Sequence, residues 1–314
     1  MTPAQHARPI LGIALKVLST LVFTAMATLI KLLSDRYPVG ELTFFRSAFA
    51  LLPVFVWVIW RGRLPGLFRT VNVGRHFVRA VSGTTAMFAG FTALSLLPIA
   101  DATAIGYAAP LMSVVFAVFL LGERVRIHRW SAVIVGLVGV LVILSDYVGP
   151  EAGGHERSAV GATLAVVGAV AGAFAATQVR VLTRHEGAAT IVVYFSIFAA
   201  LVSLATSPFG WVRPDPVDAA LLVLAGIFGG LGQVLLTQSF RFGDASTIAP
   251  FDYTSMIWAM IASVAVFGAW PSGVVLAGAA IVIGAGLFVI WREHRLGIER
   301  TRSKRAQTPT TPLS

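Results

Sequence analysis

The sequence predicts an all-α polytopic membrane protein, with ten transmembrane helices arranged as two inverted five-helix repeats. Of the 314 residues, 57% are hydrophobic and only 12% are charged, and the mean hydropathy is +0.83. A soluble domain has about 25% charged residues. Apolar runs of about 20 residues, the length that crosses a bilayer, recur along the chain. Motifs of the first half also return in the second half.

Turn residues separate the apolar runs, as in Tyr37-Pro38-Val39-Gly40 and Pro271-Ser272-Gly273. The expected helices are 10–33, 41–60, 76–96, 101–121, 127–146, 158–180, 190–206, 217–239, 245–267 and 272–291. We expect five successive parts in the chain: a cytoplasmic N-terminus (1–9), a first five-helix repeat (10–148), an external linker (149–157), a second repeat (158–292) and a basic, disordered cytoplasmic tail (293–314).

The basic residues predict how the helices are oriented. With the N-terminus inside, the inside segments hold 17 Lys or Arg and the outside loops hold four. This bias follows the positive-inside rule and predicts that both termini are cytoplasmic. We therefore interpret the net charge of +10 as a topology signal, with membrane lipids as partners, and not as a nucleic-acid site. The predicted location is a bacterial inner membrane.

Several classes of chemistry are disfavoured by the composition. The chain has no cysteine, which excludes disulfides and thiolate metal sites. Its six histidines lie in expected loops or at helix ends, so no metal cluster is expected. A nucleotide-binding loop of the G-x-x-x-x-G-K-[ST] type does not occur. We predict that the protein is not an enzyme and has neither catalytic residues nor a cofactor. Its expected partner is a small-molecule substrate. Whether it forms a homo-oligomer is left open by the sequence.

Two pairs of similar segments indicate an internal repeat. LPIADATAIGYAAP (97–110) resembles RFGDASTIAP (241–250), with Asp101 aligned on Asp244. VIVGLVGVLVI (133–143) resembles AIVIGAGLFVI (280–290). Each half thus has five helices in the same order, and because five is odd the second half is inverted. Many secondary transporters have such halves, which exchange conformations to alternate access to a central site.

Short motifs in the first half are typical of one family. They are Lys31-Leu32-Leu33-Ser34, Phe45-Arg46, Arg79, Leu97-Pro98-Ile99-Ala100-Asp101-Ala102, Pro110-Leu111 and Leu120-Leu121-Gly122-Glu123-Arg124. Together they resemble the drug/metabolite transporter superfamily, EamA type, over residues 10–292. The resemblance implies a ten-helix permease and says little about its substrate. The second half departs from the family at Phe267-Gly268-Ala269, where the family repeats Gly-Glu. This departure favours a structural role for Glu123, such as pairing with Arg124 or Arg129.

Asp252 is the residue that most suggests a substrate site. It is the eighth residue of its expected helix, about 11–12 Å deep by helical rise. It follows Pro250, which removes a backbone donor and tends to kink a helix. Tyr253 follows it, and Trp258 lies about 1.5 turns further on. A broken helix with a carboxylate at depth suits a transporter site. The alternative is an aspartate that bonds to a neighbouring helix, because an unpaired polar group is costly in hydrocarbon.

Further polar and charged residues lie within the expected spans. The substrate-site candidates are Tyr107, Gln178, Tyr194, Gln233 and Gln238. The candidates for structural or gating charges are Arg46, Arg79, Asp101, Asp244 and Glu123. Asp101 and Asp244 match the N-cap pattern. Lys16 is expected to extend its aliphatic side chain so that its ammonium group reaches the inner membrane face. Glu41 is a potential partner of Arg46, and substrate contact is the alternative.

These observations predict a secondary transporter of a small polar or amphiphilic metabolite, working by alternating access with proton coupling or exchange. The lining of acid, amides and aromatic rings suits an amino acid or its derivative, or a nucleoside-like or vitamin-like compound. Asp252 would bind a cationic group or take up a coupling proton. The alternatives are a membrane-embedded lipid-modifying or lipid-flipping protein and a passive channel.

Overall fold

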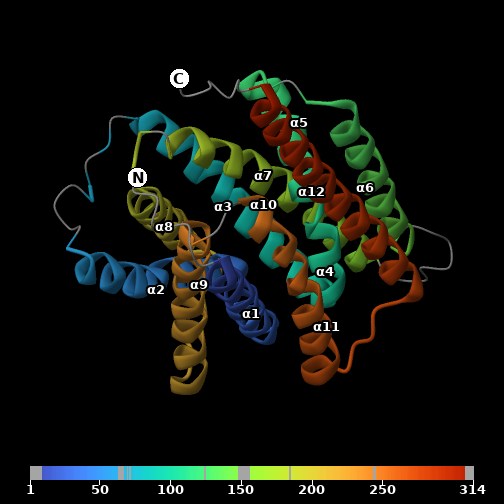
Figure 1. Cartoon of the computed structure of the whole chain (residues 1–314). Coiled ribbons are helices and arrows are strands. Elements are labelled where there is room, and N and C mark those ends of the chain that lie inside the picture. The colour runs from blue at the N-terminus through green and yellow to red at the C-terminus, as the bar shows by residue number, and fades with distance from the viewer. Residues whose placement is uncertain are drawn as a thin grey trace.

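The computed structural model describes residues 9–62, 67–68, 70, 72–123, 125–147, 156–183, 185–242 and 245–307, and every regular element in these ranges is a helix (Figure 1). The first half contains α1 (Pro9–Leu33), α2 (Val39–Trp60), α3 (Val73–Leu96), α4 (Ile99–Gly106), α5 (Ala108–Leu121) and α6 (Ile127–Ser145). The second half contains α7 (Glu156–Leu182), α8 (Ala188–Leu204), α9 (Pro216–Phe242), α10 (Ala245–Ile248), the 3-10 helix η2 (Ala249–Tyr253), α11 (Thr254–Phe267) and α12 (Gly273–Gln307).

The expectation of an all-helical polytopic membrane protein agrees with these elements. Among the described residues, eight helical segments are long and apolar enough to cross a membrane. The two other expected spans correspond to α8, which is apolar but has 17 residues, and to α3. The first two turns of α3 contain Arg75, His76 and Arg79, and these polar residues lower the hydropathy of this helix.

The fourth and ninth expected spans are each interrupted. In the first half, Tyr107 separates α4 from α5. In the second half, α10 ends at Ile248 and η2 precedes α11, so the predicted break near Pro250 is confirmed. Both spans then end at a glycine in the left-handed conformation, Gly122 with φ 65° and Gly268 with φ 64°. A left-handed residue of this kind commonly ends a helix and is usually glycine, which lacks a Cβ.

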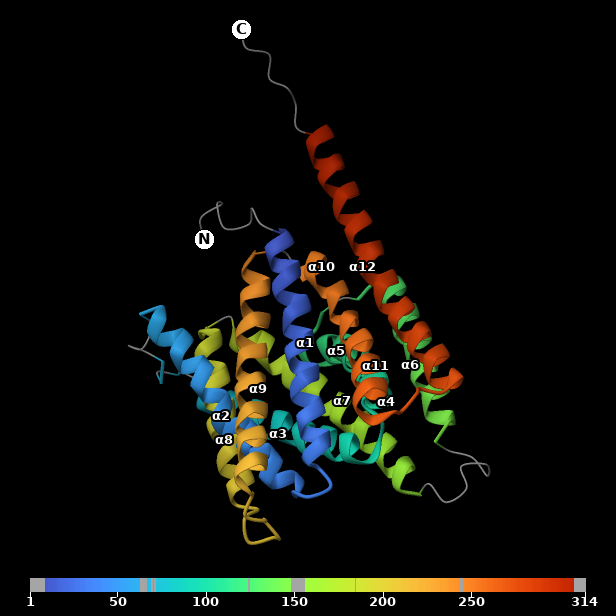
Figure 2. The ribbon, with the colours of Figure 1, turned by 90° about the horizontal axis from the view of Figure 1, so that it is seen from below.

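The helices of the two halves pack against one another in corresponding pairs. Helix α1 packs against α9 and α11, while α7 packs against α3 and α5. Helix α2 packs against α8, and α6 packs against α12 (Figure 2). Helices α6 and α12 cross closely at Gly139 and Gly278. A Cβ added to Gly139 would lie only 2.9 Å from the carbonyl oxygen of Gly278. Small residues at such crossings let two backbones approach.

Helix α12 is longer than the sequence predicted. It continues to Gln307 and projects beyond the other helices (Figure 2), so the expectation of a disordered tail from residue 293 is wrong for residues 293–307. The segment after Arg292 is rich in Arg, Glu and Lys and contains no proline before Pro309, and these residues favour helix. Residues 308–314, and the expected linker up to residue 155, lie outside the described residues.

Polar contacts join the halves at both ends of the helices. At the end predicted to face outward, Arg36 and the Tyr37 hydroxyl donate to Oδ2 of Asp218 at 2.8 and 2.9 Å. At the end predicted to face inward, buried His76 pairs with Glu186, and the Thr70 hydroxyl donates to the same carboxylate at 2.5 Å. The interface between α3 and the segment before α8 is therefore held by one buried acid.

We predict that Glu186→Gln lowers the free energy of unfolding by about 1.5–3 kcal/mol, the usual size of a buried hydrogen bond to a charged group. The measurement is thermal unfolding of the purified protein in detergent. Asp35→Asn is the control, because Asp35 is exposed. Equal stability of the Glu186 variant and the native protein would contradict a stabilising role for this contact.

Candidate substrate site

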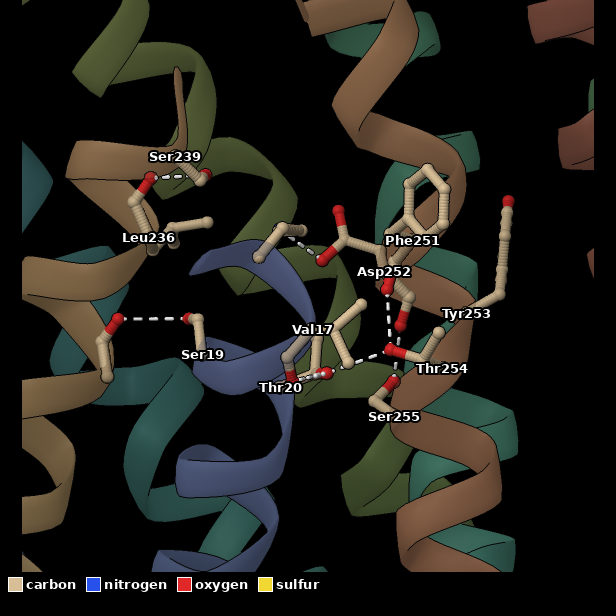
Figure 3. Close-up of polar contacts among 12 residues, drawn as sticks. Val17, Ser19, Thr20, Leu236, Ser239, Phe251, Asp252, Tyr253, Thr254 and Ser255 are labelled. Atoms are coloured by element: carbon tan, nitrogen blue, oxygen red, sulfur yellow. Dashed lines mark hydrogen bonds and ion pairs between the residues drawn. The ribbon is translucent and has the colours of Figure 1, made fainter. Parts of the chain in front are cut away.

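A buried lysine and a carboxylate meet at the break in the second half. Nζ of Lys16 on α1 lies 2.5 Å from Oδ1 of Asp252 in η2. The Lys16 side chain is 4% exposed, whereas that of Asp252 is 52% exposed. Figure 3 shows Asp252 directed from the helix break toward α1. The pair thus links the two halves and leaves one side of the carboxylate accessible.

Hydroxyl groups next to the ion pair satisfy the backbone where regular helix is lost. The Thr254 hydroxyl donates to the Phe251 carbonyl at 2.7 Å, and the Ser255 hydroxyl donates to the Asp252 carbonyl at 2.7 Å. Thr20 on α1 meets Thr254 at 2.9 Å between their hydroxyl oxygens (Figure 3). The short 3-10 segment is therefore held against α1 by side chains of both helices.

The interrupted span of the first half reaches the same place. Tyr107 lies between α4 and α5, and its hydroxyl is 2.7 Å from the Ser255 hydroxyl oxygen. Its ring meets the ring of Tyr253 edge to face, with centroids 5.1 Å apart. Tyr253 in turn packs over Gly286 of α12, where a Cβ would collide with its hydroxyl. The two broken spans therefore meet through predicted site residues.

A cavity of about 400 Å³ lies between α1, α3, α4, α5 and α7. Its lining is almost wholly apolar and small, with Thr103 as the polar exception. Larger side chains contribute at Met87, Phe91 and Leu94 of α3. A volume of this size suits a small ligand with an apolar or aromatic part.

The remaining candidates for the substrate site are more dispersed. Trp258 lies one turn beyond Thr254 in α11, and its buried Nε1 has no hydrogen-bond partner in the described part of the chain. Gln178 and Gln233 are half-buried. Gln238 accepts a bond from Arg61 at 3.1 Å, and the Tyr194 hydroxyl donates to the Phe68 carbonyl at 2.9 Å. Gln238 and Tyr194 therefore hold neighbouring segments together.

Asp101 does not act as the sequence suggested. Pro98 is the N-cap residue of α4, so the expected capping role of Asp101 is wrong. Asp101 instead accepts a hydrogen bond from the Tyr147 hydroxyl, and burial together with this contact raises the pKa of Tyr147. Asp244 lies outside the described residues.

The expected partners of the arginines and of Lys16 also need correction. Glu41 accepts a bond from the Val212 amide at 3.1 Å, so it is not the partner expected for Arg46. Lys16 does not reach the inner face but pairs with Asp252. Glu123 is exposed after the end of α5, and Arg124 lies outside the described residues. Pairing of Glu123 with Arg129 stays a prediction.

Sequence reasoning found the acid of the ion pair and missed its base. The available signal was the position of Lys16, a lysine within an expected span, because ionisable residues at such depth usually face a partner or a cavity. No spacing rule connects residue 16 to residue 252, so the pairing depends on the packing of α1 against η2 and α11.

Comparisons with known proteins agree with the fold. The model of the EamA-like transporter family matches residues 10–145 and 159–291. The S-adenosylmethionine uptake transporter of Rickettsia bellii (strain RML369-C) is 30% identical over 91% of this chain and 95% of that protein. The pseudopaline exporter CntI of Pseudomonas aeruginosa (strain UCBPP-PA14) is 27% identical over 87% and 94%. The riboflavin transporter of Rhizobium johnstonii is 27% identical over 93% and 94%.

A solved structure is also similar to this chain. It is a crystal structure of a protein with a TM-score of 0.63 and 22% sequence identity, covering 88% of this chain and 96% of that chain. At this identity the likeness concerns the fold alone. The match covers most of both chains, so the overall arrangement of the helices is similar.

Proposed function

Because this chain belongs to the EamA-like transporter family, we propose that it is a secondary transporter that moves a small polar or amphiphilic metabolite by alternating access. The Lys16–Asp252 pair carries this proposal, since it joins the two halves at a broken helix. Broken helices at the interface between repeats are where secondary transporters place their sites. The carrier would lie in a bacterial inner membrane with both termini in the cytoplasm.

Two observations support an inverted repeat as the basis of alternating access. The family model matches the chain in two consecutive segments. The contacts between the halves are also reciprocal. The first helix of the first half, α1, packs against the third helix of the second half, α9, and the first helix of the second half, α7, packs against the third helix of the first half, α3. Helices α2 with α8, and α6 with α12, pair with their own counterparts. A twofold relation between the halves produces this pattern, and an inverted repeat has such an axis in the membrane plane.

The ion pair is suited to a switch between two states. Asp252 neutralises a buried ammonium, and a buried charge without a partner is strongly destabilising. A proton or the charged group of a substrate that reaches the exposed side of Asp252 would compete with Lys16. Loss of the pair would loosen the contact between α1 and η2 and favour the alternative arrangement. We propose that this competition provides proton coupling or exchange.

The proposed substrate class is an amino-acid derivative or a nucleoside-like or vitamin-like compound. The apolar cavity of about 400 Å³ would accept a flat or hydrophobic part, and the ion pair would meet a polar part. Three similar proteins named above transport S-adenosylmethionine, pseudopaline and riboflavin. Each of these solutes falls within the proposed class, and none is assigned to this chain.

The test is untargeted metabolite profiling inside and outside cells that express the protein, followed by counterflow of each candidate solute in proteoliposomes. We expect at least one metabolite to be redistributed, and its labelled form to exchange faster when unlabelled solute is present on the other side. Linear flux without acceleration by exchange would indicate a channel. Movement of labelled lipid, without movement of any soluble metabolite, would indicate a lipid-flipping protein.

A further inference from the structure

Two arginines with buried guanidinium nitrogens, Arg46 and Arg79, have no anionic partner in the described part of the chain. Arg46 of α2 is 7% exposed, and its Nε is buried without a hydrogen bond. Arg79 of α3 has both Nε and Nη1 buried without a hydrogen bond. Building on the proposed function, we propose that these two guanidinium groups bind the carboxylate of the transported solute.

The protein's own acids do not meet this need. Glu41 accepts from the Val212 amide, Asp101 from Tyr147, and Asp218 from Arg36 and Tyr37. Asp252 is paired with Lys16. Each described acid within the membrane helices therefore has another partner. The two arginines leave an excess of positive charge inside the protein, where a charge without a counter-ion is costly.

Arg46 is connected to the cavity lining through one hydrophobic cluster. Its Nε and Sδ of Met26 both lie 3.1 Å from the position that a Cβ on Gly229 would occupy, so the guanidinium rests against the bare backbone of α9. Met26 belongs to a hydrophobic cluster with Met87 and Phe91, and those two residues also line the cavity. A solute with its apolar part in the cavity would extend its charged end past this cluster toward Arg46.

Arg79 lies on the same stripe of α3 as the cavity lining. Arg79, Gly83, Met87 and Gly90 are spaced by three or four residues, which places them on one face of the helix. Met87 and Gly90 line the cavity. The Arg79 guanidinium lies 4.1 Å from the centroid of the Phe195 ring of α8, and a Cβ on Gly83 would collide with its Nη1. Gly83 and Phe195 thus fix the guanidinium in place.

The absence of a counter-ion at both guanidinium groups, in the part of the chain that the structure describes, argues against a purely structural role. Burying two positive charges without an anionic partner opposes folding unless an anion enters. A planar guanidinium matches the two oxygens of a carboxylate, and lysine does not reproduce that geometry. The arrangement therefore favours solutes with a free carboxylate over their neutral or decarboxylated analogues.

The experiment measures binding to the full-length protein in detergent by ligand-induced thermal stabilisation. The probes are three acids, each with a partner that lacks the carboxylate: S-adenosylmethionine and its decarboxylated form, phenylalanine and its amide, and indole-3-acetate and its amide. We expect at least one acid to stabilise the native protein and its partner to bind about tenfold more weakly or worse, as loss of a charged hydrogen bond implies.

The variants are Arg46→Gln, Arg79→Gln and the charge-conserving Arg46→Lys, with Arg180→Gln as the control because Arg180 is exposed at the end of α7. We expect both glutamine variants to lose the preference for the acid, Arg46→Lys to weaken it, and Arg180→Gln to keep it. If a glutamine variant does not fold, the carboxylate preference is still tested by Arg46→Lys and by the comparison of each acid with its partner in the native protein.

Other outcomes would overturn the proposal. They are equal stabilisation by acids and their partners, the absence of stabilisation by any acid, and an unchanged preference in Arg46→Gln and Arg79→Gln. Arginine-dependent stabilisation by a short-chain phosphatidylglycerol alone would assign the two arginines to a lipid phosphate instead. If any of these results is obtained and a neutral solute still shows counterflow, the carboxylate site is refuted while the proposed transport function stands. Absence of counterflow for every solute would remove the proposed function itself.

Discussion

Asp252→Asn is expected to reduce substrate counterflow at least tenfold and to abolish its dependence on pH. The side chain has almost the same size, and its amide oxygen can still accept a hydrogen bond from Lys16. The contact between α1 and η2 is therefore weakened by the loss of the ion pair but keeps one hydrogen bond. The negative charge and the titratable proton are both lost. The variant should therefore insert and fold while losing the competition that we propose for the switch. The measurement is counterflow in proteoliposomes at several pH values, for the native protein and the variant side by side.

Two further variants separate the role of the charge from that of the fold. Lys16→Met removes the base and keeps the length of the side chain, and we expect it to lower counterflow as strongly as Asp252→Asn. The control is Asp35→Asn, an exposed position at which the same change should leave transport unaltered. Native counterflow at every pH in Asp252→Asn would refute the proposed role of Asp252. A protein that no longer folds would instead indicate that the ion pair is structural.

Gly230→Ala is expected to lower the free energy of unfolding by about 1–3 kcal/mol or more, the range for an overpacked core. A Cβ at this position of α9 would lie 2.3 Å from the Ala50 carbonyl oxygen and 2.5 Å from Cγ of Pro53, both in α2. A backbone oxygen and a proline ring cannot move aside by rotating a side chain. The helices α2 and α9 would therefore have to separate, and thermal unfolding in detergent would report the loss.

Gly284→Ala is the matched control for Gly230→Ala. Gly284 lies in α12 and is exposed, and a Cβ there would meet nothing within 4 Å. The same substitution should be neutral or stabilise the helix, because alanine has the higher helix propensity, by about 1 kcal/mol. Equal stability of Gly230→Ala and Gly284→Ala would show that α2 and α9 adapt to the added methyl group.

The helical fold was accessible from sequence because a bilayer constrains local sequence strongly. Backbone groups in hydrocarbon must be hydrogen-bonded within their own segment, so long apolar runs form helices. Pro250 likewise predicted the break that separates α10 from α11. Helix ends in water are less constrained, and there the prediction was wrong. The basic residues after Arg292 continue α12 to Gln307 instead of ending it.

The candidate site was accessible only in part. Asp252, Tyr253 and Tyr107 could be selected because polar groups stand out against apolar helices, and the structure brings these three residues together. Gln238 and Tyr194 stood out equally, yet they bond to Arg61 and Phe68. Depth along a helix can be counted from sequence. The neighbour that a side chain faces depends on how each helix is rotated and crossed by others.

Local hydropathy, one proline and repeated motifs were sufficient to predict a helical membrane protein of two similar halves with a break before Asp252. The folded structure was needed to see that Lys16 neutralises Asp252 and that Glu41 accepts a bond from Val212 and forms no ion pair with Arg46 in the described residues. Electrostatic partners in this protein lie up to 236 residues apart in sequence, between Lys16 and Asp252. Their pairing is therefore set by helix packing, which composition and periodicity do not encode.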